Sequence, residues 1–310
     1  MNVLVLGGDG YLGSHLVDEA VALGHQVTVF DRFPYGTSRN LEHLRERVRL
    51  VSGEFVNADS LRRAAEGQDI AYHFICMTSP AASWNDPYIE VEGNLRGALQ
   101  LLEVLSEAKV RKVVFPSSGG TVYGTHIQPV GEQILPKPSS PYGIAKLATE
   151  HFLEYYRQRT GLAYDVYRIG NAYGPRQPLV GPQGVVGMWM QCILDGRAVT
   201  VYGDQSVVRD YVYVKDIGRL MAYSLRDPEA SDLFNLGTGI GTSVLELLEL
   251  FKQTIHQPFE YQLLPRRTCD NVCVVLDSTK LLARLPGFRY ATLAEKLPET
   301  WDYIKQRNRP

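Results

Sequence analysis

The chain has few cysteines and little net charge, and it contains no long apolar run. Its four cysteines, Cys76, Cys192, Cys269 and Cys273, are too few and too scattered for a disulfide framework. Cys269 and Cys273 also lack the second ligand pair of a zinc site, so we expect reduced thiols and no metal. The formal net charge of −2 over 310 residues provides no basic surface for a nucleic acid.

No run of about eighteen apolar residues occurs that could span a membrane. A strand is predicted from Asn2 onward, which leaves no room for a signal peptide, so we expect a cytoplasmic protein. Its hydrophobic content of 45% is enough for a sizeable core, in one large or two modest domains.

A glycine-rich turn lies at the beginning of the chain, where Gly7, Gly10 and Gly13 are spaced three apart. The aliphatic run Asn2–Leu6 precedes it, and Ser14–Leu23 has the spacing of a helix. A strand, turn and helix in this order bring backbone N–H groups and a helix dipole to a phosphate. The pattern indicates a dinucleotide site, although a tight turn without a ligand would have the same glycines.

Asp31 ends the next predicted strand, Gln26–Phe30. A carboxylate about twenty residues beyond the glycines is placed to accept hydrogen bonds from adenosine ribose hydroxyls. It would repel a 2′-phosphate, which favours NAD over NADP, although the adjacent Arg32 could soften this preference. An ordinary residue at the end of a strand is the alternative interpretation.

Strands and helices alternate along the first half of the chain, as a parallel doubly wound sheet requires, because each crossover carries a helix back over one face. The predicted strands are Val3–Leu6, Val27–Phe30, Val48–Val51, Ile70–Ile75, Val110–Pro116 and Tyr164–Ile169. The fold class is therefore α/β.

After Asn171 the stretches Gly174–Pro178 and Gly181–Gly187 are rich in glycine and proline and are predicted to be loops. We expect residues 1–170 to form an NAD-binding Rossmann domain and residues 171–310 to be mainly a smaller substrate domain. Later segments such as 208–237 are expected to return to the first domain, because Asp232–Leu236 is another strand-like run.

A second motif, Tyr142-Gly-Ile-Ala-Lys146, follows Pro141 at the start of a predicted helix. Tyr142 and Lys146 are one turn apart on the same face. Tyrosine has a pKa near 10, but an ammonium and a positive nicotinamide ring both favour the phenolate. Lowering the pKa by about three units requires only about 4 kcal/mol. Tyr142 could then act as a general base, whereas an ordinary amphipathic pair is the alternative.

With these motifs the chain resembles the extended short-chain dehydrogenase/reductase family, and within it the nucleotide-sugar epimerases of the UDP-glucose (UDP-galactose) 4-epimerase type. The matching segments are GGDGYLGSH, HFICMTSPAAS, FPSSGGTVYG, SPYGIAK, RIGNAYGPRQ, VRDYVYVKDI, FNLGTG and PRRTCD. The resemblance implies tightly held NAD and a smaller C-terminal domain that binds a UDP-sugar.

The resemblance also implies the catalytic residues. Tyr142 and Lys146 match the catalytic pair, and Ser118 matches the hydroxyl that hydrogen-bonds the reacting sugar oxygen, with Ser117 and Thr121 as alternatives. The related 4,6-dehydratases carry an Asp-Glu pair just before VYG. Here Gly120 and Thr121 occupy these positions, so dehydration is disfavoured.

For the cofactor and the substrate, the resemblance implies two sets of residues. The NAD set is Gly7, Gly10, Tyr11, Leu12, Gly13, Asp31, Glu54, Phe55, Phe74, Ile75, Cys76, Asn94, Ser117, Tyr142 and Lys146. Glu54 stands where the family usually has Asp.

The substrate set joins Ser118 to residues of the second half of the chain. Asn171, Arg209 and Arg267 should contact the diphosphate. Asp270 should accept from a ribose hydroxyl, and Thr200 to Tyr202 should offer backbone groups to uracil.

The expected reaction is NAD-dependent epimerisation at C4 of a UDP-hexose, with glucose, N-acetylhexosamine and hexuronic acid as candidate sugars. A reductase or dehydrogenase of the same family and a non-catalytic NAD-binding regulator are the alternatives. The resemblance also implies a homodimer formed through helices near Leu95–Ala108 and Tyr142–Arg159. Both carry apolar positions beyond one stripe, although simple burial against the sheet is the alternative.

Overall fold

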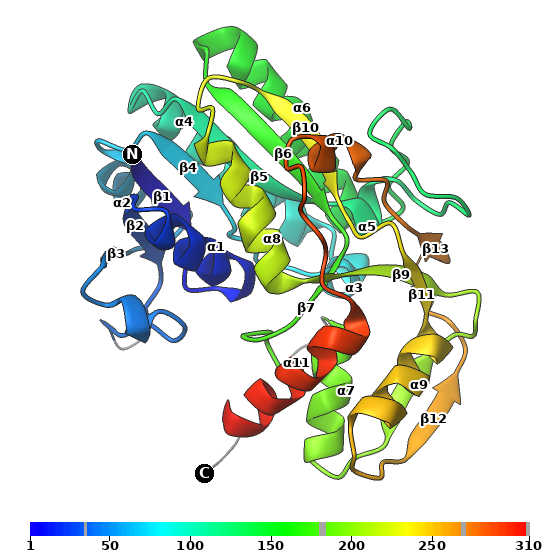
Figure 1. Cartoon of the computed structure of the whole chain (residues 1–310). Coiled ribbons are helices and arrows are strands. Elements are labelled where there is room, and N and C mark those ends of the chain that lie inside the picture. Colours follow the sequence, from blue (N-terminus) through cyan, green and yellow to red (C-terminus); the bar gives the residue numbers. More distant parts are fainter. Residues whose placement is uncertain (34–35, 180–183, 268–270, 308–310) are drawn as a thin grey trace. The chain divides into compact units, whose positions relative to one another are not determined.

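The computed structural model describes residues 1–33, 36–179, 184–267 and 271–307, and the chain groups into two units (Figure 1). The first unit consists of Met1–Ser118, Ser140–Arg168 and Ile217–Phe234. The second consists of Gly119–Ser139, Ile169–Asp216 and Asn235–Pro310. The chain therefore passes between the units several times. The assignment of NAD binding to residues 1–170 and of substrate binding to residues 171–310 stays a prediction.

A seven-stranded parallel sheet forms the centre of the first unit, in the order β10-β6-β5-β4-β1-β2-β3. Its strands are β1 (Asn2–Leu6), β2 (Gln26–Asp31), β3 (Val48–Ser52), β4 (Ile70–His73), β5 (Lys112–Ser118), β6 (Ala163–Ile169) and β10 (Asp232–Leu236). The strand order reverses between β1 and β4, because the chain crosses to the other half of the sheet after β3. The predicted α/β class with a doubly wound parallel sheet is confirmed.

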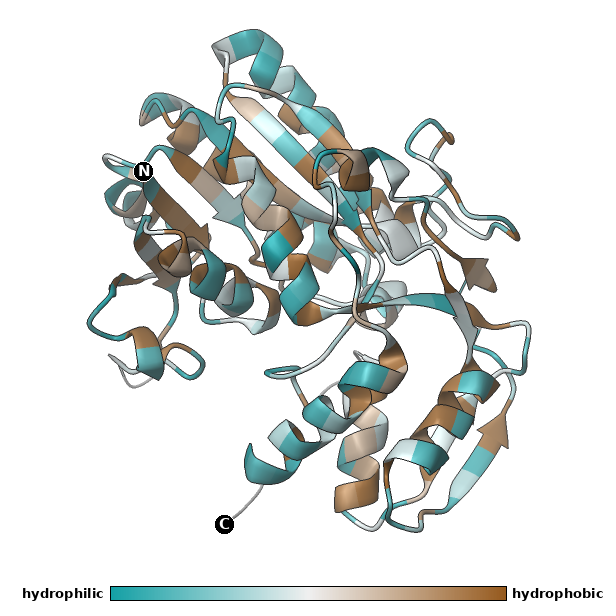
Figure 2. Ribbon diagram, in the orientation of Figure 1, coloured by the Kyte–Doolittle hydropathy of each residue, from teal (hydrophilic) through white to brown (hydrophobic). Residues whose placement is uncertain are grey.

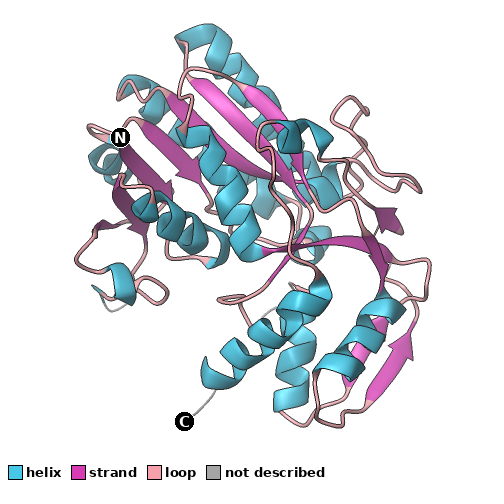
Figure 3. Ribbon diagram, in the orientation of Figure 1, coloured by secondary structure: helices cyan, strands magenta, loops and turns pink. Residues whose placement is uncertain are grey.

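Helices cover both faces of this sheet (Figure 3). The helices in this part of the chain are α1 (Tyr11–Ala22), α2 (Ala58–Ala65), α3 (Pro80–Asn85), α4 (Arg96–Glu107), α6 (Pro141–Thr160) and α8 (Val214–Met221), with short 3-10 turns η2 (Glu42–Leu44) and η4 (Ala222–Leu225) and the π-helix η3 (Glu90–Leu95). α4 packs between α2 and α6, whereas α1 contacts η4 in the other layer. Because parallel strands need crossovers, this two-layer covering follows from the topology.

The strands at the centre of the sheet are buried and almost entirely apolar. Residues 3–6 of β1 are fully buried, and Figure 2 shows the apolar colour along this strand and a mixture of both colours around α1. Apolar side chains of α2, α4 and α6 pack on one face of the sheet. Burial on both faces explains why β1, β4 and β5 have continuous apolar runs rather than alternation.

A buried ion pair ties the late segment Ile217–Phe234 to the first unit. Lys112 of β5 donates to Asp165 of β6 at 2.8 Å, and their side chains are only 2% and 4% exposed. The ammonium also donates to the carbonyl of Asp227, and Ser224 donates to Asp165 at 2.6 Å. The segment therefore completes the hydrogen bonding of a charge pair that would be costly to bury unsatisfied.

The second unit contains smaller sheets. Strand β9 (Val208–Tyr213) pairs with β7 (Asn171–Tyr173), β11 (Gly241–Ser243) and β13 (Cys273–Val274), while β8 (Val199–Tyr202) pairs in parallel with β12 (Tyr261–Leu264). Its helices are α5 (Gly119–Val122), α7 (Val185–Leu194), α9 (Val244–Thr254), α10 (Thr279–Ala283) and α11 (Leu293–Arg307). A second apolar core joins α7, α9 and α11 to β8 and β9.

The predicted return of Asp232–Leu236 to the large sheet is confirmed as β10. The loop predicted over Gly181–Gly187 is wrong at its end, because α7 begins at Val185. Its apolar residues Val186 and Met190 pack in the second core, and this tertiary burial overrides the glycines around them. Residues 180–183 lie outside the described part of the chain.

Within the described ranges, Cys76, Cys192 and Cys273 are free thiols, and Cys269 lies outside them. None of the helices in these ranges is long and apolar enough to cross a membrane. Nor do the described side chains include a group of three or more His, Cys, Asp and Glu that could hold a metal ion.

The buried ion pair leads to a stability prediction. Replacing Lys112 by Met leaves Asp165 buried without its cation, and we expect the free energy of unfolding to fall by about 3–5 kcal/mol in urea titrations. Arg157→Met breaks an exposed pair with Glu154 and should change it far less. Equal losses of unfolding free energy in the two variants would contradict the larger cost that we expect for breaking the buried ion pair.

Candidate functional site

The turn after β1 has the form of a cradle for an anion. Gly7 has a positive φ of 74°, and Gly10 precedes the first residue of α1 without a side-chain cap. A Cβ on Gly13 would collide with the carbonyl oxygen of Gly7, so glycine lets the helix approach the turn. No acidic residue lies in the first turn of α1, where Tyr11 and Leu12 begin the helix. The N-terminal dipole therefore remains available for a phosphate.

Asp31 lies beside this turn at the carboxyl end of β2. It accepts from the N–H of Asp9 at 3.1 Å and of Arg32 at 2.8 Å, and burial raises its pKa. Each carboxylate oxygen has a further lone pair, so Asp31 keeps acceptor capacity for a ribose hydroxyl. The structure thus brings Asp31 and the glycine turn together as predicted.

Asp9 is a site residue that the sequence did not reveal. Its carboxylate accepts from the Ser38 hydroxyl at 2.5 Å and from the N–H groups of Arg39 and Asn40 at 2.8 and 2.9 Å. It therefore orders the loop that follows β2 against the glycine turn. The sequence signal for this role was an acid inside the glycine motif. A negative charge is unfavourable beside a bound phosphate, so an acid at this position indicates a different role.

The segments after β3 and β4 occupy different environments. A Cβ on Gly7 would lie 3.0 Å from both Phe74 and Ile75, so these predicted residues pack directly against the turn. Phe55 faces the core, where its ring stacks on His73 with centroids 5.0 Å apart. Glu54 is exposed. Only backbone atoms of Phe55 can therefore serve a ligand in this arrangement.

Helix α6 presents Tyr142 and Lys146 as predicted. Ser140 caps the helix by accepting from Gly143, and Pro141 occupies its first turn. The Lys146 ammonium donates to the carbonyl of Pro116 at 2.9 Å and lies 5.7 Å from the centre of the Tyr142 ring. The pair is thus anchored to the end of β5.

The pKa of Tyr142 is raised in the protein alone, whereas the lowered pKa expected from the sequence includes a positive nicotinamide ring beside it. Burial raises this pKa well above its ordinary value, and the Cys76 thiol and the Glu90 carboxylate raise it further. In the protein alone, these effects set the direction of the shift. The lowering predicted from the sequence therefore requires an additional positive charge next to the ring.

The two serines at the end of β5 differ in environment. Ser117 is buried and donates to Glu150 at 2.5 Å, and Arg168 binds the other oxygen of that carboxylate at 2.6 Å. Ser118 is half-buried at the last position of the strand. The alternative Thr121 belongs to α5 of the second unit. Because the hydroxyl of Ser117 is held in the core, Ser118 remains the better candidate.

Asn94 lies in η3 and is already engaged by protein groups. Its carbonyl oxygen accepts from the N–H of Met77 at 2.9 Å, and its amide donates to Thr78 and Glu90, each at 2.8 Å. It thereby fixes the loop after β4, which carries Cys76. Glu90 and Thr78 are further residues of this site that were not predicted from the sequence. The sequence signal for Glu90 was an acid four residues before Asn94, which places both side chains on one face of a helix.

In the second unit, two predicted substrate residues lie on adjacent strands. Asn171 of β7 is half-buried, and β7 pairs with β9, which carries Arg209. Arg209 donates to the carbonyls of Val208 and Val272 at 2.9 and 3.1 Å. These bonds fix one end of its guanidinium group.

Arg267 and the strand β8 form a second group in this unit. The guanidinium of Arg267 lies 5.1 Å from the ring centre of Tyr202, a cation–π distance. The carbonyl of Thr200 accepts from Trp189 at 3.0 Å, so this oxygen is shared with the core. Asp270 lies outside the described residues.

Comparison with known proteins gives consistent similarities. The profile of the family described as NAD dependent epimerase/dehydratase matches residues 3–237. The UDP-glucose 4-epimerase of Mycolicibacterium smegmatis is 33% identical over 312 residues, covering 99% of this chain and 100% of the relative.

Two solved structures are also similar. The UDP-glucose 4-epimerase of Thermotoga maritima, solved with UDP-glucose, is 34% identical with a TM-score of 0.88 and covers 99% of both chains. The Thermus thermophilus UDP-glucose 4-epimerase in complex with NAD is 34% identical with a TM-score of 0.89, covering 98% of this chain and 99% of that one.

The buried His73 leads to a prediction of pH dependence. Burial, and then the charge of Lys146, lower its pKa to about 3. The unfolded chain binds a proton below about pH 6.5 and the folded one does not, so stability falls as the pH drops from there. Between pH 6.5 and 5 we expect a loss of about 2 kcal/mol in urea titrations. His73→Phe should remove this pH-dependent loss of stability. An unchanged pH dependence of the unfolding free energy in that variant would contradict its assignment to His73.

Proposed function

Because the chain belongs to the NAD-dependent epimerase/dehydratase family, we propose that it is an NAD-dependent 4-epimerase of a UDP-hexose. The observation that supports this most is the position of Tyr142 and Lys146. They lie one helical turn apart, next to the end of β5, in the unit that also holds the glycine turn.

The first unit fits NAD. Its glycine turn leaves room for a diphosphate where any larger residue at Gly13 would collide, and Asp31 offers acceptor oxygens at the end of β2. When bound, NAD supplies the hydride acceptor and donor for C4 of the sugar. The proposal also includes the other predicted NAD residues, to which we assign no specific contact. These are Glu54, Phe55, Phe74, Ile75, Cys76 and Asn94.

The chain's own residues supply the proton transfer. Tyr142 removes the proton from the C4 hydroxyl, and Ser118 hydrogen-bonds the same sugar oxygen. Lys146, held by the carbonyl of Pro116, keeps a positive charge near the Tyr142 ring and opposes the effect of burial on the phenolate. Epimerisation then requires the 4-keto sugar to present its other face before the proton returns.

The second unit supplies the contacts to the nucleotide. Arg209, Arg267 and Asn171 bind the diphosphate, and the strand Thr200 to Tyr202 binds the base. An arginine fork suits phosphate oxygens, and the two bonds to carbonyls preorganise that of Arg209. A firm grip on the diphosphate leaves the hexose free to turn, which epimerisation needs and a simple oxidation does not.

The test is to incubate the purified protein with catalytic NAD and one sugar nucleotide at a time, following the anomeric proton by NMR. UDP-glucose, UDP-N-acetylglucosamine and UDP-glucuronic acid form the panel. We expect the matching galacto isomer of one of them without net reduction of NAD. Tyr142→Phe should abolish conversion while NAD stays bound, because it removes the proton acceptor and little else.

Other outcomes point to the alternatives. Net production of reduced cofactor would indicate a dehydrogenase or reductase. No conversion of any sugar nucleotide, with NAD bound, would indicate a regulator. Conversion by Tyr142→Phe at the rate of the unaltered protein would refute the role of Tyr142.

A second prediction separates the serines. Ser118→Ala should lower kcat by about 10²-fold, because a hydrogen bond at the reacting oxygen is lost. Ser117→Ala removes the hydroxyl held by Glu150 and should mainly lower the free energy of unfolding, by about 1–2 kcal/mol. Steady-state kinetics and urea titrations of both variants, with Thr121→Ala, measure this. The reverse ranking in kcat would transfer the role to another hydroxyl.

A further inference from the structure

Glu90 is a buried acid beside the catalytic pair that the proposed chemistry does not use. It is only 2% exposed, at the first position of η3. The hydroxyl of Thr78 donates to one oxygen of its carboxylate, and the amide of Asn94 donates to the other at 2.8 Å. Among the described residues, no Lys, Arg or His nitrogen lies within 4.0 Å of it as an ion-pair partner. A buried charge with neutral hydrogen-bond partners acts on its surroundings over a longer range.

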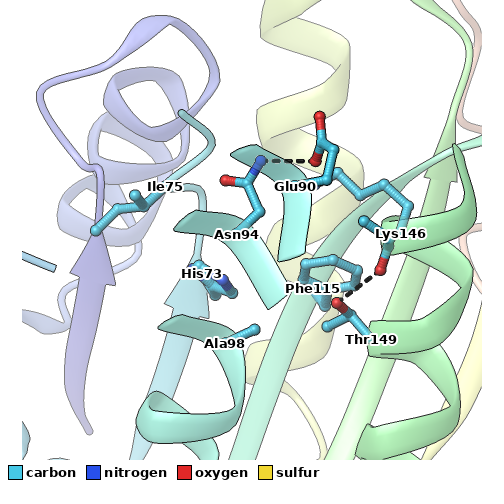
Figure 4. A pocket seen from close by; sticks show the side chains of 9 residues that line it. His73, Ile75, Glu90, Asn94, Ala98, Phe115, Lys146 and Thr149 are labelled. Atoms are coloured by element: carbon cyan, nitrogen blue, oxygen red, sulfur yellow. Dashed lines mark hydrogen bonds between the residues drawn. The ribbon is translucent and has the colours of Figure 1, made fainter. Parts of the chain in front are cut away.

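A small cavity joins Glu90 to Lys146 (Figure 4). Its volume is about 20 Å³, enough for one water molecule, and its polar lining residues are Glu90, Asn94, Lys146, His73 and Thr149. His73 is 5% exposed, and its Nδ1 has no hydrogen-bond partner among the described residues. Polar residues that include His73, Glu90 and Lys146 around a space of this size favour a bound water.

We propose that Glu90 is a further positioning residue of the reaction, the counter-charge to Lys146 across this one-water cavity, and that it sets how readily Tyr142 gives up its proton. The inference rests on the proposed role of Tyr142 as the base. Lys146 favours the phenolate and Glu90 opposes it, so the balance of the two charges determines the pH at which Tyr142 becomes competent.

The groups that face Tyr142 support this balance. The loop after β4 contributes Cys76, η3 contributes Glu90, and α6 itself contributes Lys146. His73 of β4 lines the cavity in its neutral form. Helix α3, which packs on α6, carries no titratable side chain, and α4 contributes only Ala98 to the cavity. Burial is the largest cause of the raised pKa of Tyr142, and Glu90 is the carboxylate that adds to it.

A purely structural role makes a different prediction. Through Thr78 and Asn94, Glu90 also ties the loop after β4 to η3, and loss of this link would lower stability without moving a titration. Removing the charge by Glu90→Gln should instead shift Tyr142 toward lower pH. Glu92→Gln is the matched control, because Glu92 is exposed two residues further along the same helix.

The experiment uses the full-length protein with NAD bound and tyrosine labelled with ¹³C at Cζ. The Tyr142 resonance is assigned by its absence in Tyr142→Phe, and its midpoint is followed by NMR against pH. We expect Glu90→Gln to lower the midpoint by about one pH unit and Glu92→Gln to leave it in place. The acidic limb of the kcat profile should move by the same amount. Glu90→Met, of similar length, replaces Glu90→Gln if that variant does not fold.

The two readouts separate this inference from the proposed function. A shifted midpoint without turnover on any sugar nucleotide would support the role of Glu90 and refute the epimerase proposal. Turnover with an unshifted midpoint and an unshifted limb in the folded Glu90 variant would overturn the inference and leave the epimerase proposal intact.

Discussion

The position of helix α6 against the sheet depends on one buried carboxylate. Glu150 lies one turn after Lys146 and two turns after Tyr142, so the three side chains share a face of the helix. It accepts from Ser117 of β5 and is bound on both oxygens by Arg168 of β6. Because a charge buried this deeply is tolerated only with full hydrogen bonding, the two strands and the helix are held in a single register. The Lys146 bond to Pro116 and the position of Ser118 follow from that register.

The parts of the fold that the sequence predicted are those set by local pattern. Six apolar runs became β1 to β6 of one sheet, with ends that differ by a residue or two. Strands buried on both faces form continuous apolar runs that are visible in the sequence, and only β3, at the edge of the sheet, is partly exposed throughout. The start of α6 was predictable for a similar reason, since Ser140 and Pro141 form a standard N-terminus. The glycine turn was predictable because the close approach of Gly13 to Gly7 leaves room for no larger side chain.

The remaining features depend on contacts between distant segments. Adjacent serines in a strand point to opposite sides, but only the structure shows that Ser117 is the one that meets Glu150. The direction of the Tyr142 pKa could not be derived from its spacing to Lys146. It depends on burial and on Glu90, which is more than fifty residues away in the chain. Similarly, Asp9 acquires its role only because the loop at Ser38 to Asn40 folds back on it.

The late arrival of β10 has a consequence for synthesis of this enzyme on the ribosome. Its place in the sheet is beside β6, and the partners Ser224 and Asp227 of the Lys112–Asp165 pair come from the same late segment. Until residue 236 has left the exit tunnel, the nascent sheet ends in the unpaired edge of β6, above a charge pair that lacks part of its hydrogen bonding. Exposed strand edges are where growing chains associate wrongly. A chain that ends after Ile169 is therefore an unfinished sheet rather than a separate domain, and the edge of β6 stays exposed until the late segment docks.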